Sequence, residues 1–199
     1  MATELTVVAA WDFNGTEGTT DPRVGSGRLA LTGATSLMMA GGVGSSDPER
    51  RYPPNHCLGI YNFPPQGAGS ESAGVAFFVP TTGHGGVRVG FDVYPDALSS
   101  RWIRLQWTVD GGESWRRGEI TGELKELGLY DLKAAAWYQL ETDLSADGEV
   151  DDNPAFGFRL VSAFSPGSSS YEACGNHNPY SRFGLMFVDM VTVQARRRG

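Results

Sequence analysis

Two pairs of neighbouring histidine and cysteine residues are the first places in the chain where chemistry could occur. His56 and Cys57 are adjacent, and His177 follows Cys174 by three positions. The Cys-x-x-His spacing is compatible with zinc, but the adjacent pair His56 and Cys57 strains chelation by both side chains. A disulfide between Cys57 and Cys174, or two free thiols, are the simpler interpretations, because both cysteines lie in loop-like sequence rich in Gly, Pro and Asn.

The common sequence motifs of enzymatic chemistry are absent from the chain. Its three histidines, His56, His84 and His177, stand in separate Gly- or Pro-flanked segments without His-x-x-x-His spacing. There is no Gly-x-Ser-x-Gly nucleophile elbow and no P-loop. No signature marks a converging pair of carboxylates of the kind that hydrolyses glycosides. We therefore expect no catalytic residues and a protein that is not an enzyme.

Composition and charge restrict the partners. The 199 residues include 16 Lys and Arg against 23 Asp and Glu, a formal net charge of -7. Nucleic-acid binding is disfavoured, because neutralising phosphates needs clustered Lys and Arg, and the one basic cluster here is Arg196 to Arg198. No apolar run approaches the roughly 20 residues that span a bilayer, and the N-terminus lacks a charged segment followed by a long apolar core. We expect neither a nucleic-acid partner nor membrane insertion.

The pattern of turns and apolar residues predicts an all-β fold. The chain has 27 Gly and 11 Pro and only 20% charged residues, and no long stretch has helical periodicity. We expect one two-sheet jelly-roll β-sandwich of about ten strands over residues 1–195, followed by a basic tail at 196–199. The one helical or irregular insertion is expected at Leu124 to Ala136. Alternation bounded by turn residues predicts strands at Thr6 to Phe13, Arg28 to Leu31, Ser36 to Met39, Cys57 to Tyr61, Ser72 to Val79, Gly86 to Tyr94, Arg101 to Val109, Ser114 to Ile120, Trp137 to Leu144, Phe156 to Phe164 and Phe183 to Gln194.

An exposed sheet face is the best candidate for ligand binding. Three of the predicted strands alternate apolar residues with polar or aromatic ones, so each strand has one inward and one outward face. If these strands are neighbours, a single face presents rings on which sugars can stack and planar polar groups that can hydrogen-bond to hydroxyls. Cross-strand ion pairs, or burial of the face by a partner subunit, are the alternatives. The candidate ligand-binding residues are Asp92, Tyr94, Trp102, Arg104, Gln106 and Arg159.

The segment from Thr108 to Trp115 fits the Asp-box pattern that occurs in sialidase propellers. In this hairpin Asp110 can accept hydrogen bonds from the turn and Gly112 can supply a positive φ. A propeller would repeat the unit in every blade, whereas it occurs once here. We interpret it as a local structural turn.

A broader resemblance extends over nearly the whole chain. Its short motifs are WDFNGT at residues 11–16, GSSDP at 44–48, FPPQG at 63–67, AGVAF at 73–77, VDG at 109–111, VDDNPAFGFR at 150–159 and FVDMVTV at 187–193. In order and kind, this series is similar to the jelly-roll β-sandwich domains of bacterial extracellular proteins, including PEP-CTERM surface proteins, and to carbohydrate-binding modules. The resemblance implies a non-catalytic accessory module outside the cell or on its surface.

The same resemblance implies a structural calcium ion. Jelly-roll carbohydrate-binding modules often hold Ca²⁺ where the first and last strands run together, and the matching carboxylates are Asp12 and Asp189. Asn14 would supply a further oxygen, since calcium takes six to eight oxygen ligands. Alternatively, Asp12 caps a turn and Asp189 pairs with an arginine on the same sheet.

Two functions from different classes follow. The first is a binding module that recognises carbohydrate or another cell-surface component through the exposed sheet face. The second is a structural assembly subunit, such as a virion decoration or filament protein, whose sheet face or whose Gly41 to Asn55 loop packs against copies of itself. The expected location is accordingly extracellular or at the cell surface, or else the virion.

Overall fold

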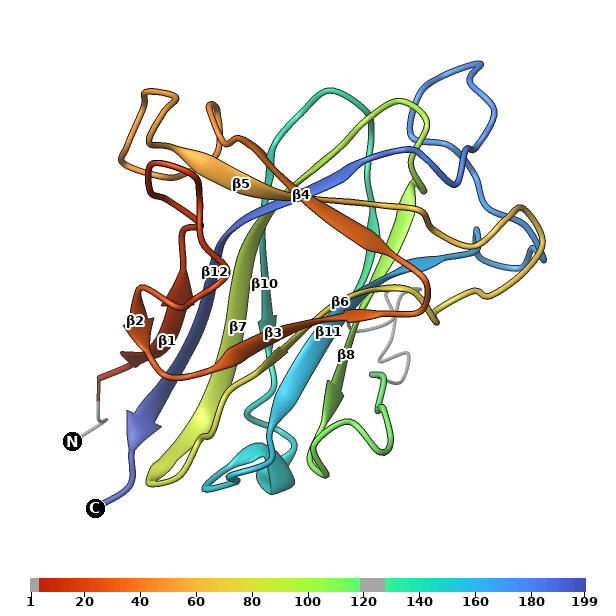
Figure 1. Cartoon of the computed structure of the whole chain (residues 1–199). Coiled ribbons are helices and arrows are strands. Elements are labelled where there is room, and N and C mark those ends of the chain that lie inside the picture. Colours follow the sequence, from red (N-terminus) through yellow and green to blue (C-terminus); the bar gives the residue numbers. More distant parts are fainter. Residues whose placement is uncertain (1–3, 119–127) are drawn as a thin grey trace.

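Alternating apolar residues build a sandwich of short antiparallel strands (Figure 1). The computed structural model describes residues 4–118 and 128–199, and within them twelve strands and one 3-10 turn. The strands are β1 (Thr6–Trp11), β2 (Val24–Gly25), β3 (Arg28–Thr32), β4 (Ser36–Gly41), β5 (His56–Tyr61), β6 (Gly74–Phe78), β7 (His84–Pro95), β8 (Trp102–Thr108), β9 (Leu129–Asp131), β10 (Tyr138–Asp143), β11 (Gly157–Ala163) and β12 (Met186–Arg197), and the 3-10 turn η1 covers Gly148–Val150.

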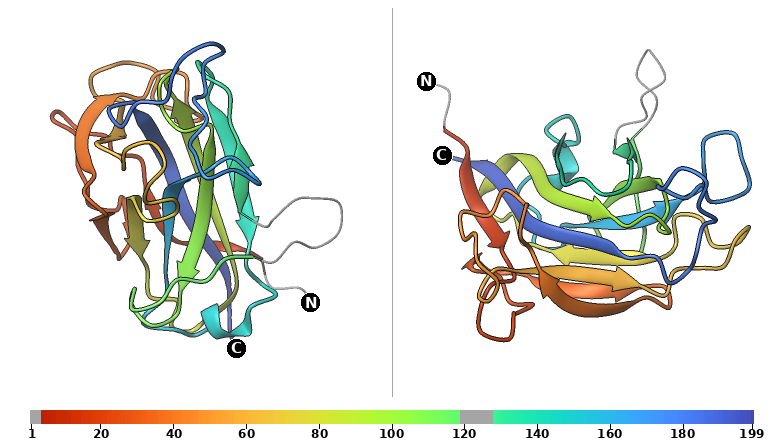
Figure 2. Two further views of the ribbon diagram at one scale, coloured as in Figure 1. Left: turned by 90° about the vertical axis from the view of Figure 1, so that its right-hand side faces the viewer. Right: turned by 90° about the horizontal axis from the view of Figure 1, so that it is seen from above.

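The strands form two sheets that face each other (Figure 2). Sheet A has the order β10-β7-β12-β1-β2, and β5 also pairs with the first part of β12 and carries β4 on its other side. Sheet B has the order β3-β6-β11-β8-β9. The predicted all-β, two-sheet sandwich of the jelly-roll type is confirmed, with slightly more strands than expected. None of the described residues forms a helix long and apolar enough to cross a membrane.

The core lies between the sheets and contains the residues that the alternation predicted to face inward. Trp11 from sheet A packs edge-on against Phe77 from sheet B, with ring centroids 5.1 Å apart, and Phe77 stacks on Phe158 at 5.2 Å. All three rings are almost fully buried. Burying such a side chain contributes roughly 1.5–3 kcal/mol, so these rings hold the two sheets together. The predicted inward residues of β7 and β8 are buried as well, namely Val87, Val89, Phe91, Val93, Ile103, Leu105 and Trp107.

Two predicted elements differ from the structure. The strand expected at Ser114 to Ile120 is wrong over its described part, where Arg116 makes only an isolated bridge to Trp107. Of the insertion expected at Leu124 to Ala136, residues 124–127 lie outside the described residues, and β9 pairs with β8 just after them. A strand of three residues is too short for alternation to reveal it.

The C-terminal arginines belong to the sheet rather than to a separate tail. β12 continues to Arg197, with Arg196 opposite Gly85 and Arg197 opposite His84. β12 therefore extends two residues past the expected boundary at residue 195, because strand pairing with β7 continues beyond the apolar alternation.

Candidate functional site

The six predicted ligand-binding residues lie on two opposite faces of the molecule. Asp92 and Tyr94 belong to β7 in sheet A, whereas the other four, Trp102, Arg104, Gln106 and Arg159, belong to β8 and β11 in sheet B. The expectation of one common face is wrong, because the alternation defines the two sides of each strand but not which strands adjoin. A ligand can therefore contact only part of the predicted set.

On sheet B, an internal network occupies three of the predicted residues. The Glu71 carboxylate, from the loop before β6, accepts hydrogen bonds from Arg104 Nε at 2.7 Å and from Gln106 Nε2 at 2.9 Å. Arg159 donates to the Glu71 carbonyl at 3.1 Å and to Gln106 Oε1 at 2.8 Å. Arg104 and Gln106 are only 4% and 5% exposed. These side chains support the fold more than they present a surface.

Trp102, the predicted stacking ring on this face, is also engaged. Its indole N–H donates to Glu172 at 3.1 Å, and the Arg101 guanidinium lies 5.4 Å from the centroid of its ring. Arg101 is itself held by ion pairs with Asp131 and Glu172. Trp102 is therefore a half-buried part of a charged cluster.

The outer face of sheet A carries a row of large side chains that sequence reasoning missed except for Tyr94. Met38 on β4, Phe187 on β12 and Tyr94 on β7 follow one line across the sheet, because Met38 pairs with Gly59, Gly59 with Phe187, and Phe187 with Tyr94. Trp137, just before β10, completes the line. The ring centroid of Tyr94 lies 5.6 Å from that of Trp137 and 5.9 Å from that of Phe187. We call these four side chains, which are three aromatic rings and Met38, the aromatic row.

Gly59 lets the side chains of the aromatic row adjoin, and the loop after β4 holds the row at its other end. A Cβ atom on Gly59 would lie 3.0 Å from Met38 Cγ and 3.2 Å from Phe187 Cε1, so the missing side chain lets these two neighbours close over β5. At the other end the Trp137 indole N–H donates to the Val43 carbonyl at 3.3 Å. The loop after β4 thus fixes the orientation of the Trp137 ring.

Polar side chains lie further along the same face. The residues that line a hollow of about 290 Å³ on this face include Ser46, Gly90, Thr192, Gln139 and Glu141. Both Gln139 and Glu141 are exposed. Arg88 forms ion pairs with Glu141 at 3.5 Å and with Asp143 on the same face. Amide and carboxylate groups are thus available beside the rings.

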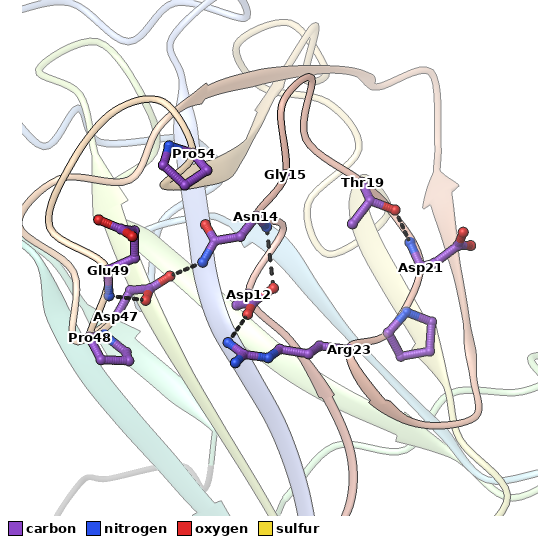
Figure 3. A pocket seen from close by; sticks show the side chains of 11 residues that line it. Asp12, Asn14, Gly15, Thr19, Asp21, Arg23, Asp47, Pro48, Glu49 and Pro54 are labelled. Atoms are coloured by element: carbon purple, nitrogen blue, oxygen red, sulfur yellow. Dashed lines mark hydrogen bonds and ion pairs between the residues drawn. The ribbon is translucent and has the colours of Figure 1, made fainter.

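The predicted calcium ligands Asp12 and Asn14 line a different hollow, of about 660 Å³, at the end of β1 (Figure 3). Asp12 Oδ2 pairs with Arg23 at 2.5 Å, and Asp12 Oδ1 accepts from the Asn14 backbone N–H at 3.2 Å. The Asn14 amide donates to Asp47 at 2.7 Å, and its oxygen accepts from the His56 backbone N–H at 2.9 Å. Asp12 therefore makes the turn contact that was the alternative to metal binding.

Asp189, the third predicted calcium ligand, lies beneath the loop after β4 and opposite Asp92 of β7. Both aspartates are buried, Asp189 fully and Asp92 to within 3%. Ser45 Oγ donates to Asp189 Oδ2 at 2.7 Å, and the Met190 backbone N–H donates to Oδ1 at 2.8 Å. Burial, together with the charges of Asp47 and Asp92, raises the pKa of Asp189 to about 7. This part of the fold therefore concentrates negative charge in its interior.

The donor set around Asp189 suits a hard cation. Asn55 Oδ1 is buried and has no hydrogen-bond partner. A Cβ atom on Gly42 would lie 2.3 Å from Asn55 Oδ1, 2.7 Å from Asp189 Oδ2 and 3.0 Å from the His56 carbonyl oxygen, so these three oxygens converge. Within residues 4–118 and 128–199, no group of three or more His, Cys, Asp or Glu side chains could hold a metal ion. An ion here would depend on amide and carbonyl oxygens as well, which calcium accepts.

The two cysteines are separate free thiols, so the disulfide considered from the sequence is absent. Cys57 Sγ lies on β5 of sheet A and donates to the Gly41 carbonyl. Cys174 Sγ donates to the Ser100 carbonyl beside the start of β8 in sheet B. Burial raises the pKa of both thiols to about 12.

Comparisons with known proteins support the fold. No protein-family model matches the chain, and no curated protein does. Among solved structures, the CBM22-2 xylan-binding domain of Paenibacillus barcinonensis Xyn10C has a TM-score of 0.55 at 12% identity, over 94% of this chain and 98% of that one. The CBM22-1 domain of the same protein has a TM-score of 0.52 at 11% identity over all of both chains. The module TmCBM27, described for specific mannan recognition, has a TM-score of 0.51 at 12% identity over 97% and 99%. This chain therefore has the β-sandwich fold of carbohydrate-binding modules.

Proposed function

We propose that the chain is a non-catalytic carbohydrate-binding module that holds a polysaccharide on the aromatic row. One observation carries the proposal, namely that Met38, Phe187, Tyr94 and Trp137 form a single cross-strand line on the outer face of sheet A. Neighbouring strands lie roughly 4.8 Å apart, so four strand steps extend the row over roughly 19 Å. That length suits several consecutive pyranose rings.

The chemistry of the row favours sugars over other ligands. Pyranose C–H groups stack on aromatic faces, and side-chain amides and carboxylates bind the hydroxyls at the ring edge. Tyr94 and Trp137 supply rings, while Gln139 and Glu141 supply exposed polar groups on the same face. The fold shared with xylan-binding and mannan-recognising modules supports this choice and makes xylan and mannan the first ligands to test. The proposed location is extracellular or at the cell surface, where such polymers occur.

Affinity electrophoresis in gels that contain xylan, mannan or other neutral polysaccharides tests the proposal. We expect retardation of the wild type, and at least about tenfold weaker binding for Trp137→Ala and Tyr94→Ala, since losing one ring contact of about 1.4 kcal/mol reduces affinity tenfold. Trp102→Ala is the matched control, because it removes a ring from the opposite face. Circular dichroism confirms that each variant is folded. The proposal fails if no polysaccharide retards the wild type, or if Trp102→Ala abolishes binding while Trp137→Ala retains it.

We also propose a structural calcium ion centred on Asp189, with Asn55 and the His56 carbonyl as further ligands. The buried, unpartnered Asn55 oxygen and the burial of Asp189 beside Asp92 support this assignment. Asp12, a calcium ligand implied by the resemblance to jelly-roll modules, is paired with Arg23 and is not in this ligand set. Such an ion would offset buried negative charge and fix the loop after β4, which holds Trp137.

A further inference from the structure

The outer face of sheet B carries a cluster in which arginines stack on aromatic rings. The Arg28 guanidinium lies 3.7 Å from the centroid of the Phe78 ring. Phe78 meets Trp115 edge-on at 6.1 Å, and the Arg159 guanidinium lies 4.3 Å from the Trp115 ring centroid. Each ring thus already holds a cation on one face, which makes this surface different in kind from the aromatic row.

The cluster is positively charged, although the protein as a whole is acidic. Arg104, Arg117 and Arg159 gather around Glu71, and Arg28 lies over the Phe78 ring of the same face, in a chain with a formal net charge of -7. Arg104 and Arg159 are engaged in the network around Glu71. Arg117 is largely exposed and reaches Glu71 only at 3.6 Å. The neighbouring carboxylate of Asp110 is engaged by Ser114 and Thr108 within its own turn.

Arg28 is the cation with the most capacity for a ligand. It is exposed, and in the part of the chain that the structure describes it makes no ion pair. Stacking holds a guanidinium plane in place while its N–H edge remains free, which prepares it for two parallel hydrogen bonds to a carboxylate. Arg28 also borders a hollow of about 380 Å³ with mainly apolar walls, including Phe78, Pro80 and Pro154. A ring with an attached carboxylate matches this combination of an apolar hollow and a cation at its rim.

We propose that this face is a second binding site, for the uronic acid residues of an acidic polysaccharide, with Arg28 binding the carboxylate and the hollow receiving the sugar ring. This second site is separate from the aromatic row. It would bind an acidic ligand, whereas the aromatic row is proposed to bind a neutral one. A nucleic acid fits less well, because its charge lies on phosphates between the sugars, whereas the apolar hollow beside Arg28 suits a ring that itself carries the carboxylate.

Calorimetric titration with oligogalacturonate, and with the same oligosaccharide after reduction of its carboxyl groups, tests this site. The wild type should bind only the charged form, and more weakly as salt is raised. Arg28→Gln should weaken binding about tenfold or more, whereas Arg28→Lys, which keeps the charge but lacks the planar fork, should lie between Arg28→Gln and the wild type. Arg88→Gln, on the opposite face, is the matched control and should bind like the wild type.

Several results would overturn the proposal. They are absence of oligogalacturonate binding to the wild type, equal binding of the reduced oligosaccharide, full affinity in folded Arg28→Gln, or equally tight binding of a single-stranded DNA of similar length. Loss of binding in Trp137→Ala would place the acidic ligand on the aromatic row instead. Because the neutral polysaccharides test the aromatic row and oligogalacturonate tests Arg28, either proposal can fail without the other.

Discussion

Asp189 is fully buried, yet it faces a second carboxylate, that of Asp92, across two paired strands. Bringing two like charges together in the interior is unfavourable, because burial weakens solvation of both. Hydrogen bonds from Ser45 and Met190 relieve this cost in part. A bound cation would relieve much more, and it would explain why Asn55 directs an unpartnered oxygen to the same place.

Calcium should therefore stabilise the folded protein through Asp189. With free calcium at 100 times its dissociation constant, binding adds about 2.7 kcal/mol, which corresponds to roughly 5–10 °C in Tm for a chain of this size. Calorimetric melts with calcium and with a chelator should differ for the wild type but not for Asp189→Asn. Asp12→Asn, which removes only the pair with Arg23, should keep the calcium response. Equal melting of the wild type with calcium and with chelator would contradict the ion.

The cysteine thiols should be inert in the folded protein. Burial raises the pKa of both to about 12, so the reactive thiolate at pH 8 is roughly a thousandfold scarcer than for an exposed cysteine. We expect mass spectrometry to show slow iodoacetamide modification of the native chain and two rapid additions in denaturant. Rapid labelling of the native chain would contradict this burial.

At the scale of elements, the loop before β6 is the part that closes the outer face of sheet B. Glu71 adopts a φ of 61°, a left-handed conformation that a residue with a side chain rarely takes. That conformation directs its carboxylate onto β8, while its backbone N–H donates to Ser162 in β11 at 2.8 Å. The loop thus ties two neighbouring strands together.

Glu71→Ala should destabilise the fold by about 2–3 kcal/mol, because Arg104 and Gln106 remain buried after losing a charged partner. Urea denaturation measures this change. Glu113→Ala removes an exposed carboxylate from the nearby hairpin and should stay within about 0.5 kcal/mol of the wild type. Binding of neutral polysaccharide should persist in both variants, because the aromatic row lies on the other sheet. An unchanged midpoint for Glu71→Ala would show that the contacts of the Glu71 carboxylate are dispensable.

Some of the strands and their neighbours could be predicted from the sequence, and others could not. Alternation located the long strands β7, β8 and β12 and their inward residues, because each has one apolar side against a core. It could not find β9, and it could not assign β7 and β8 to different sheets. The aromatic row escaped prediction for this reason, since Met38, Phe187 and Trp137 come together only through the pairing of strands distant in the sequence.

At the scale of the whole molecule, the sandwich has two outer faces with different chemistry. The outer face of sheet A has aromatic rings beside exposed polar groups, whereas the outer face of sheet B has arginines stacked on aromatic rings. The charged residues predicted as one ligand set are divided between these faces, so a single broad groove is excluded for them. The face that a neutral glycan contacts therefore decides whether the aromatic row is the binding site.

The indole groups report that contact directly. The chain has five tryptophans, of which Trp11 and Trp107 are buried, Trp102 and Trp115 are associated with sheet B, and Trp137 stands alone on the outer face of sheet A. A ¹H–¹⁵N NMR titration with a neutral xylan or mannan oligosaccharide should shift the Trp137 indole signal in a saturable manner and leave those of Trp102 and Trp115 in place. Saturable shifts at Trp102 or Trp115 with Trp137 unmoved would contradict the proposal that the aromatic row binds the glycan.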